Sequence, residues 1–105
     1  MLTPLHYAAQ DGHLEVCRTL LEYKVEKNPK DVNWDTPLHL AANEGKHQVI
    51  KILLDAMVEK DPRNNDGFTP LHSAARKGHS EVCLILLQNQ VEKIPKTRME
   101  TLPYT

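Results

Sequence analysis

The apolar residues of the chain recur at helical spacing within a unit that repeats. In the first unit, one apolar stripe falls on positions 5, 8 and 9 and a second on positions 16, 17, 20 and 21, with Gly12 between them. Such spacing puts each stripe on one face of a short helix, and glycine allows the sharp turn that joins the two helices. We therefore predict an antiparallel helical hairpin, with helices over about 4–11 and 14–23.

The same pattern returns twice along the chain. The stretch Thr3-Pro4-Leu5-His6 at the start of the first helix recurs at Thr36 and at Thr69, a step of 33 residues each time (36 − 3 and 69 − 36). All seven prolines fall in two registers with this step, namely 4, 37, 70, 103 and 29, 62, 95. A fixed period of this size is typical of stacked repeat proteins, in which each unit buries its apolar face against its neighbours.

The later units predict the same elements. Their first helices begin after Thr36 and Thr69 and end at Gly45 and Gly78, and their second helices cover about 47–56 and 80–89. Between units, polar segments broken by proline predict extended connections that end in tight turns, most clearly at Asp66-Gly67. We predict one domain over 1–105, with repeats at about 3–35, 36–68 and 69–101 and the start of a fourth at 102–105.

A repeated sequence motif of the chain resembles the ankyrin repeat. The motif is Thr-Pro-Leu-His-x-Ala-Ala-x-x-Gly, followed by His-x-Glu-Val-Cys and a Leu-Leu pair. The resemblance covers nearly the whole chain. It implies an all-α solenoid of stacked helix-turn-helix hairpins with projecting β-hairpin-like finger loops. It also implies a non-catalytic protein-protein interaction module, which binds a protein partner through the finger tips and the exposed face of the first helix of each repeat.

The chain departs from the ankyrin pattern where the family usually carries glycine. After the second helix of each repeat, the residues that replace it are Lys24, Met57 and Gln90, so these helices are expected to fray or to run longer. In the fingers, Gly67 is present, but Trp34 and Glu100 replace the other two glycines. Because asparagine tolerates left-handed backbone and tryptophan does not, we expect Asn33 to take that conformation in the first finger.

Composition and charge narrow the classes of function. With 40% hydrophobic and 26% charged residues, the chain falls in the range of a soluble globular domain. Lys and Arg number 13 and Asp and Glu 14, so no overall basic field favours nucleic acid. The N-terminus does not resemble a signal peptide, and no apolar run is long enough to cross a membrane. We expect a soluble, intracellular, cytoplasmic protein with no cofactor.

The two cysteines, Cys17 and Cys83, are 66 residues apart (83 − 17), which is two whole repeats. If repeats stack at roughly 8–10 Å, the two cysteines lie about twice that distance apart, too far for a disulfide. We therefore expect free, buried thiols in a reducing compartment. His13 with Cys17 and His79 with Cys83 have the i, i+4 spacing of two metal ligands, but further ligands are missing and Ile50 replaces cysteine in the middle repeat. We predict no metal site.

One histidine recurs at the same place in each repeat, as His6, His39 and His72. Such recurrence favours a structural role over catalysis, and the resemblance also implies hydrogen bonds to the threonine hydroxyl of the same repeat and to neighbouring backbone. The sequence has no phosphate-binding glycine loop, nucleophile elbow or evident pair of catalytic carboxylates. We predict that the chain is not an enzyme.

Positions that differ between otherwise similar repeats indicate where a partner binds. On the first helices and in the fingers these candidate residues are Tyr7, Gln10, Asp11, Asn33, Trp34, Asp35, Leu40, Asn43, Glu44, Asn65, Asp66, Phe68, Ser73, Arg76 and Lys77. Exposed aromatic residues among them would anchor a partner, and the change from acidic to basic residues along the face would orient it. The sequence leaves open whether Trp34 is exposed or packs under the next finger; for Phe68 we expect the packed position.

Neither end of the array carries the polar capping helix that stacked repeats use. We therefore expect the apolar faces of the first two helices and of the last helix to be partly exposed, which predicts end-to-end self-association. The same feature supports a second hypothesis, in which the chain is an internal structural segment, or an excised or engineered fragment, of a longer ankyrin scaffold with no partner of its own.

Overall fold

The computed structural model of the chain describes residues 2–23, 25–59 and 61–92. Within these ranges it has six helices and no strand: α1 (Pro4–Asp11), α2 (Leu14–Glu22), α3 (Pro37–Asn43), α4 (His47–Asp55), α5 (Pro70–Lys77) and α6 (Ser80–Glu92). The predicted all-α class and all six helices are confirmed. The expected third finger and the start of a fourth repeat, 97–105, lie outside the described residues.

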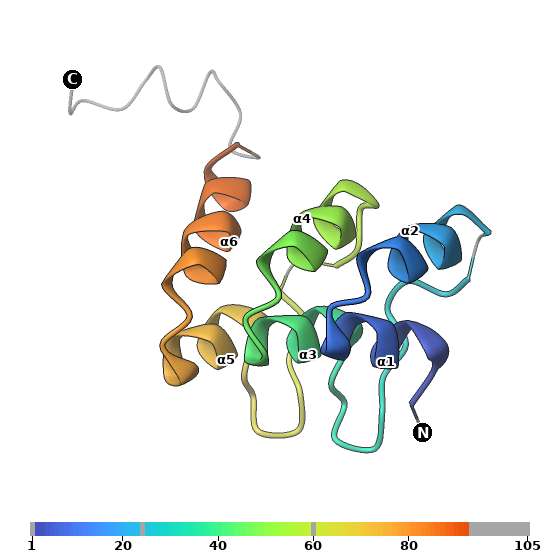
Figure 1. Cartoon of the computed structure of the whole chain (residues 1–105). Coiled ribbons are helices and arrows are strands. Elements are labelled where there is room, and N and C mark those ends of the chain that lie inside the picture. Colours follow the sequence, from blue (N-terminus) through green and yellow to red (C-terminus); the bar gives the residue numbers. More distant parts are fainter. Residues whose placement is uncertain (1, 24, 60, 93–105) are drawn as a thin grey trace.

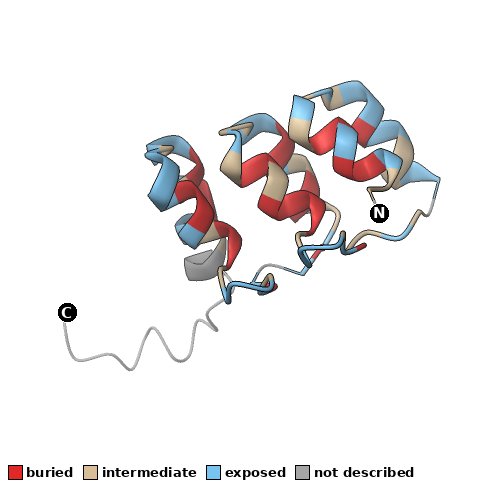
Figure 2. Cartoon of the chain, turned by 90° about the horizontal axis from the view of Figure 1, so that it is seen from below, coloured by how far each residue is buried: buried red, intermediate tan, exposed pale blue. Residues whose placement is uncertain are grey.

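The helices form two rows (Figure 1). Helices α1, α3 and α5 lie in one row and α2, α4 and α6 in the other, and the connections between repeats project as fingers beyond the first row. Each helix packs against its hairpin partner and against the equivalent helix of a neighbouring repeat. The buried residues therefore face inward between the rows, while the fingers carry mostly exposed residues (Figure 2). No helix in the described ranges is long and apolar enough to span a membrane.

The first helix of each repeat begins with the same cap. In the second repeat the Thr36 hydroxyl accepts a hydrogen bond from the backbone N–H of His39 at 3.3 Å, and the Nδ1 of His39 accepts one from the backbone N–H of Thr36 at 3.1 Å. This reciprocal pair satisfies two backbone donors that a helix start otherwise leaves free. Pro37 follows at the first helical position, where a missing N–H costs nothing.

The same histidines join neighbouring repeats. Because Nδ1 accepts from a backbone N–H, the proton of the neutral ring must be on Nε2. His6 Nε2 then donates to the Asp35 carbonyl and His39 Nε2 to the Phe68 carbonyl, each at 2.8 Å. Each of these two histidines therefore ties the cap of its own helix to the end of the following finger, which confirms the predicted structural role.

The ends of the helices meet the expectations in part. Gly12 and Gly78 end α1 and α5 with left-handed backbone at a φ of 77°. Met57, one of the residues that replace glycine after the second helices, is also left-handed, with a φ of 67°. Helix α6 continues to Glu92, past the expected end at 89, as the absence of glycine there allows.

The exposure of the end helices was predicted correctly for α2 and α6 but not for α1. Val16 on α2 and Leu84 and Leu87 on α6 are each about half exposed. The apolar stripe of α1 is instead buried, with Leu5 at 2% exposure, because α2 and α3 cover it.

Both cysteines are free thiols. Cys17 is fully buried, and burial raises the pKa of its thiol from 9.0 to about 11. Cys83 is only partly buried, so the expectation of a buried thiol is wrong for this residue. Its equivalent in the first repeat is covered by the following hairpin, whereas Cys83 lies on the last hairpin of the described stack.

Candidate protein-binding surface

The first finger is a tight turn built on Asp31. Its carboxylate oxygen accepts hydrogen bonds from the backbone N–H groups of Asn33 and Asp35, each at 2.9 Å. The backbone N–H of Trp34 donates to the Asp31 carbonyl at 2.9 Å. These bonds fix the path of the tip from both ends, so Trp34 is presented by a defined loop.

The second finger repeats this turn with Asn64 in the place of Asp31. The side-chain oxygen of Asn64 accepts from the backbone N–H groups of Asp66 and Phe68, and its carbonyl accepts from the N–H of Gly67. Arg63 adds a hydrogen bond from its guanidinium to the Gly67 carbonyl at 2.9 Å. The two fingers therefore share one backbone plan.

The fingers are also bonded to each other. The backbone N–H of Asn65 donates to the Asn33 carbonyl at 3.0 Å, and its side-chain amide donates to the Val32 carbonyl. The Asn64 amide donates to the Asp35 carboxylate at 2.9 Å. Asn65 and Asp35, both predicted to contact a partner, are thus used to hold the two fingers side by side.

The structure contradicts the expectation for the strained position of the first finger. Trp34, not Asn33, has left-handed backbone, with a φ of 65°. The two bonds to the Asp31 carboxylate hold Asn33 and Asp35 in place, and the chain must turn at the residue between them. That residue is Trp34, which occupies the place of Gly67 in the second finger.

Trp34 is 51% exposed, so the structure shows the exposed position, one of the two that its sequence left open. The Nζ of Lys30 lies 4.4 Å from the centre of the indole ring, a cation–π contact that covers one face of the ring. Val32, beside it on the same finger, is 77% exposed. Together Trp34 and Val32 form an apolar finger tip.

Two basic residues that support the fingers were missed by reasoning from variable positions. Lys30 and Arg63 are 33 residues apart (63 − 30), and Lys96 continues the same register outside the described residues. The first covers the indole of Trp34 and the second bonds the backbone of Gly67. The sequence signal that could have identified these two residues is a basic residue that recurs at the same distance before each finger tip.

On the helices, the candidate residues differ in how far they are exposed. Tyr7 is 55% exposed and Leu40 is partly buried. Ser73, at the same place in the third repeat, is 8% exposed, because α5 packs against α3. Ser73 is therefore not available to a partner, contrary to the prediction, and Leu40 contributes less surface than Tyr7.

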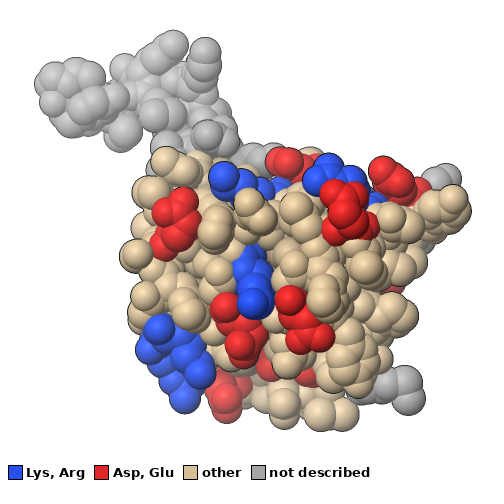
Figure 3. Space-filling model, viewed as in Figure 1, with Lys and Arg blue, Asp and Glu red and all other residues tan. Residues whose placement is uncertain are grey.

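The charged residues of the first helices are exposed at their C-terminal ends. Asp11 and Glu44 lie near the ends of α1 and α3, and Arg76 and Lys77 form the last turn of α5. Figure 3 shows basic side chains gathered over the end of α5 at the lower left and acidic side chains nearer the middle. In the described part of the chain none of these four side chains forms an ion pair, although Glu44 accepts a hydrogen bond from Asn43 and Arg76 lies over the Phe68 ring. None of the four charges is therefore neutralised by an opposite charge. Gln10 and Asn43, before the two acidic residues, are half-buried.

Phe68, the last residue of the second repeat, packs against α5 of the third repeat. Its ring stacks on His72 with 5.7 Å between ring centres, and the guanidinium of Arg76 lies 5.5 Å from the centre of the Phe68 ring. Whether it also lies under the third finger concerns residues outside the described ranges. Phe68, His72 and Arg76 form a column along α5, which holds Arg76 beside the second finger.

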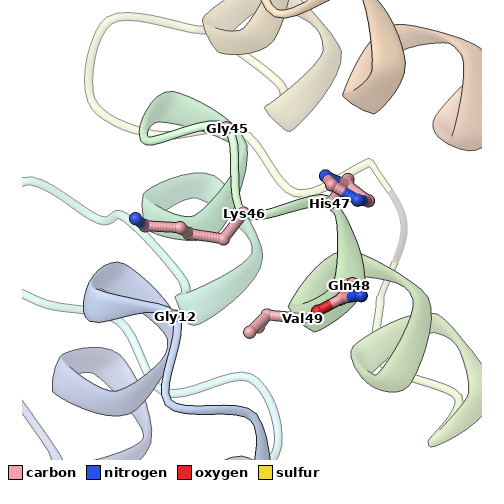
Figure 4. A pocket seen from close by; sticks show the side chains of 6 residues that line it. All are labelled: Gly12, Gly45, Lys46, His47, Gln48 and Val49. Carbon is pink, nitrogen blue, oxygen red and sulfur yellow. The ribbon is translucent and has the colours of Figure 1, made fainter.

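No cluster of metal-binding side chains accompanies this surface in the part of the chain that the structure describes. No three His, Cys, Asp or Glu side chains there lie close enough to hold a metal ion. A small pocket of about 150 Å³ lies between the Gly12 turn and the start of α4 (Figure 4). The side chain of Lys46 extends across it, so the pocket is a gap between repeats and not a prepared ligand site.

The stacked hairpins, the threonine–histidine caps and the bonded fingers define a helical repeat protein that presents a surface of loops and helix faces. A comparison with protein families finds ankyrin repeats, three copies, over residues 5–97. The chain belongs to the ankyrin repeat family, whose members are typically non-catalytic and generally serve as protein-interaction modules. A search of curated proteins finds no match.

Proposed function

We propose that the chain is a non-catalytic protein-interaction domain. Its partner binds across the finger tips and the exposed faces of α1, α3 and α5. The observation that carries this proposal is Trp34, whose left-handed backbone costs about 1–2 kcal/mol in a residue other than glycine. Half of this side chain is nevertheless exposed, which leaves a large apolar surface in contact with water. An exposed tryptophan at a strained position is explained by binding.

The surroundings of Trp34 indicate the chemistry of the partner. Trp34 and Val32 offer an apolar contact at the finger tip, and the bonds between the fingers keep it in place before the partner arrives. A surface ordered in advance loses less entropy on binding. We infer that the partner places an apolar or aromatic side chain against this tip.

The free charges set the direction in which the partner lies. Acidic groups of the partner are favoured beside Arg76 and Lys77, and basic groups beside Asp11 and Glu44. The separation of acidic from basic residues is a property of this face and not of the whole chain, whose net charge is only −1. The two free thiols favour a reducing compartment, which supports an intracellular partner.

The test is a selection from a displayed peptide library against the wild-type chain. Binding of the selected peptides is then measured on Trp34→Ala and on Met57→Ala, an exposed residue far from the fingers. Trp34→Ala is expected to weaken binding by more than about 1 kcal/mol, roughly fivefold, and Met57→Ala to leave it unchanged. The double variant Arg76→Glu, Lys77→Glu should select peptides with basic instead of acidic residues. Equal affinity for the wild type and a folded Trp34→Ala would exclude Trp34 from the site.

A further inference from the structure

The last hairpin of the described stack exposes groups that the second hairpin buries. Ala42 is 0% exposed, whereas its equivalent Ala75 is exposed. Leu54 is 8% exposed and its equivalent Leu87 46%. In the second repeat these residues are covered by α5 and α6. The uncovered counterparts line a groove of about 450 Å³, which we call the outgoing face: Ala75, Gly78, Ser80, Cys83, Leu84 and Leu87.

One residue makes the outgoing face more apolar than the repeat requires. Leu84 occupies the register of Arg18 and Lys51, and all three side chains are exposed. At the first two positions the exposed residue is charged, as is usual for a surface in water. In the third repeat it is leucine, 49% exposed. Because the equivalent Lys51 stays exposed at the border between α4 and α6, Leu84 adds apolar area at the rim of the outgoing face.

At the opposite end of the described stack, the first hairpin also leaves an apolar residue uncovered. Val49 and Val82 are each 1% exposed, but their equivalent Val16 is 49% exposed. Figure 4 shows why, because Val49 points from α4 toward the Gly12 turn of the preceding repeat. Nothing precedes α2 in the described stack to receive Val16. We call this end, with His13 and Val16, the incoming face.

The contact between the second and third repeats shows how such faces join. His79 Nε2 hydrogen-bonds to the Asn43 carbonyl at 3.0 Å, and the His79 ring lies where a side chain on Gly45 would be, 2.7 Å from an added Cβ. The first repeat carries the same residues at its incoming face, since His13-x-Glu-Val-Cys matches His79-x-Glu-Val-Cys. His13 is exposed.

We propose that a second copy of this chain docks its incoming face on the outgoing face, in the register of the contact between the second and third repeats. His13 of the second copy donates to the Arg76 carbonyl, the equivalent of Asn43, and Val16 packs beside Gly78. The space over Gly78 is open, because an added Cβ there would meet no atom within 4 Å. The contact joins two different faces and leaves one of each free, so copies add into open chains and do not stop at a closed dimer.

The experiment uses sedimentation velocity over a range from low micromolar to millimolar protein. The wild-type mass is expected to rise above 12.0 kDa with concentration. Val16→Glu blocks the incoming face and Leu87→Glu the outgoing face, so each variant alone should stay monomeric. An equimolar mixture retains one intact face of each kind and should form a dimer of twice the monomer mass that does not grow further. Met57→Glu, an equally drastic change at an exposed residue away from both faces, should associate like the wild type.

Two results would overturn the proposal. A wild-type chain that stays at the monomer mass at every concentration would show that copies of the chain do not dock through these faces. Self-association of Val16→Glu alone would show that the contact joins two identical faces.

The rate of alkylation of Cys83 in the unmutated chain gives a second measurement, which does not depend on whether a variant folds. It should fall as protein concentration rises, and a constant rate would contradict the proposed contact.

Discussion

Trp34 and Gly67 occupy the same place in successive fingers, and both have left-handed backbone, with φ values of 65° and 79°. Glycine takes this conformation without steric cost, and tryptophan does not. Replacing Trp34 with glycine relieves that cost, while the loss of the Lys30 contact and the greater freedom of the unfolded chain act in the opposite direction. We expect Trp34→Gly to be more stable than Trp34→Ala by about 1 kcal/mol, measured by urea unfolding.

The control for this comparison is Gly67→Ala. An added Cβ at Gly67 would have no atom within 4 Å, so the substitution tests the backbone alone. It should destabilise the chain by about 1–2 kcal/mol. If Trp34→Gly and Trp34→Ala are equally stable while Gly67→Ala costs this amount, the left-handed backbone of Trp34 does not persist in solution.

The turn glycines of the hairpins are expected to differ in cost although their backbone is alike. Gly45 and Gly78 have φ values of 72° and 77°. An alanine Cβ at Gly45 would lie 2.7 Å from Nδ1 of His79, whereas at Gly78 it would meet nothing. Gly78→Ala should cost about 1–2 kcal/mol, and Gly45→Ala about 1–3 kcal/mol more because of the overlap. Urea unfolding at low protein concentration, where the chain is monomeric, measures both.

A double variant separates the cost of the steric overlap with His79 from the cost of the left-handed backbone. Replacing His79 with alanine removes the ring that Gly45→Ala would strike, so in that background the extra cost of Gly45→Ala should vanish. An extra cost that survives the removal of His79 would mean that the two repeats do not pack at the distance described.

The recurring histidines are expected to contribute unequally to stability. His39 is 1% exposed and bonds both Thr36 and the Phe68 carbonyl, so His39→Ala leaves buried polar groups unpaired. We expect a loss of about 2–4 kcal/mol from this variant. His72 is exposed and, in the described part of the chain, hydrogen-bonds only to Thr69, so His72→Ala should cost about 1 kcal/mol, as for a helix cap. Equal losses from thermal or urea unfolding would show that the contact between repeats contributes little.

Much of the fold could be predicted because each local signal agrees with the repeat. Thr-Pro at each helix start and Gly12 and Gly78 at the ends of α1 and α5 gave the bounds of the first helices, since caps depend on a few adjacent residues. The end of α6 could not be placed in this way. No glycine stands at the expected end, and α6 continues to Glu92.

The candidate site was less predictable, because exposure depends on what lies next to each residue in space. Ser73 has the same register as Tyr7, and variability suggested that both are exposed. Ser73 is buried because α3 lies in front of α5, while nothing in the described stack lies in front of α1. The assignment of left-handed backbone to Asn33 failed for a related reason, since the hydrogen bonds of Asp31 outweigh the intrinsic preference of the residue at the turn.

The two cysteines are expected to react with alkylating reagents at very different rates. The thiolate is the reactive form, and a pKa of about 11 for Cys17 against 9.0 lowers its thiolate fraction at pH 8 about 100-fold. Burial at 0% exposure slows access further, so Cys17 should react only when the chain opens. Cys83, partly exposed on α6, should react with iodoacetamide in the native state.

Mass spectrometry of the time course should show one rapid modification in the wild type and none in Cys83→Ser. Addition of urea through the unfolding transition should then make Cys17 reactive. A rapid second modification under native conditions would mean that α2 separates from α4 far more often than their packing implies.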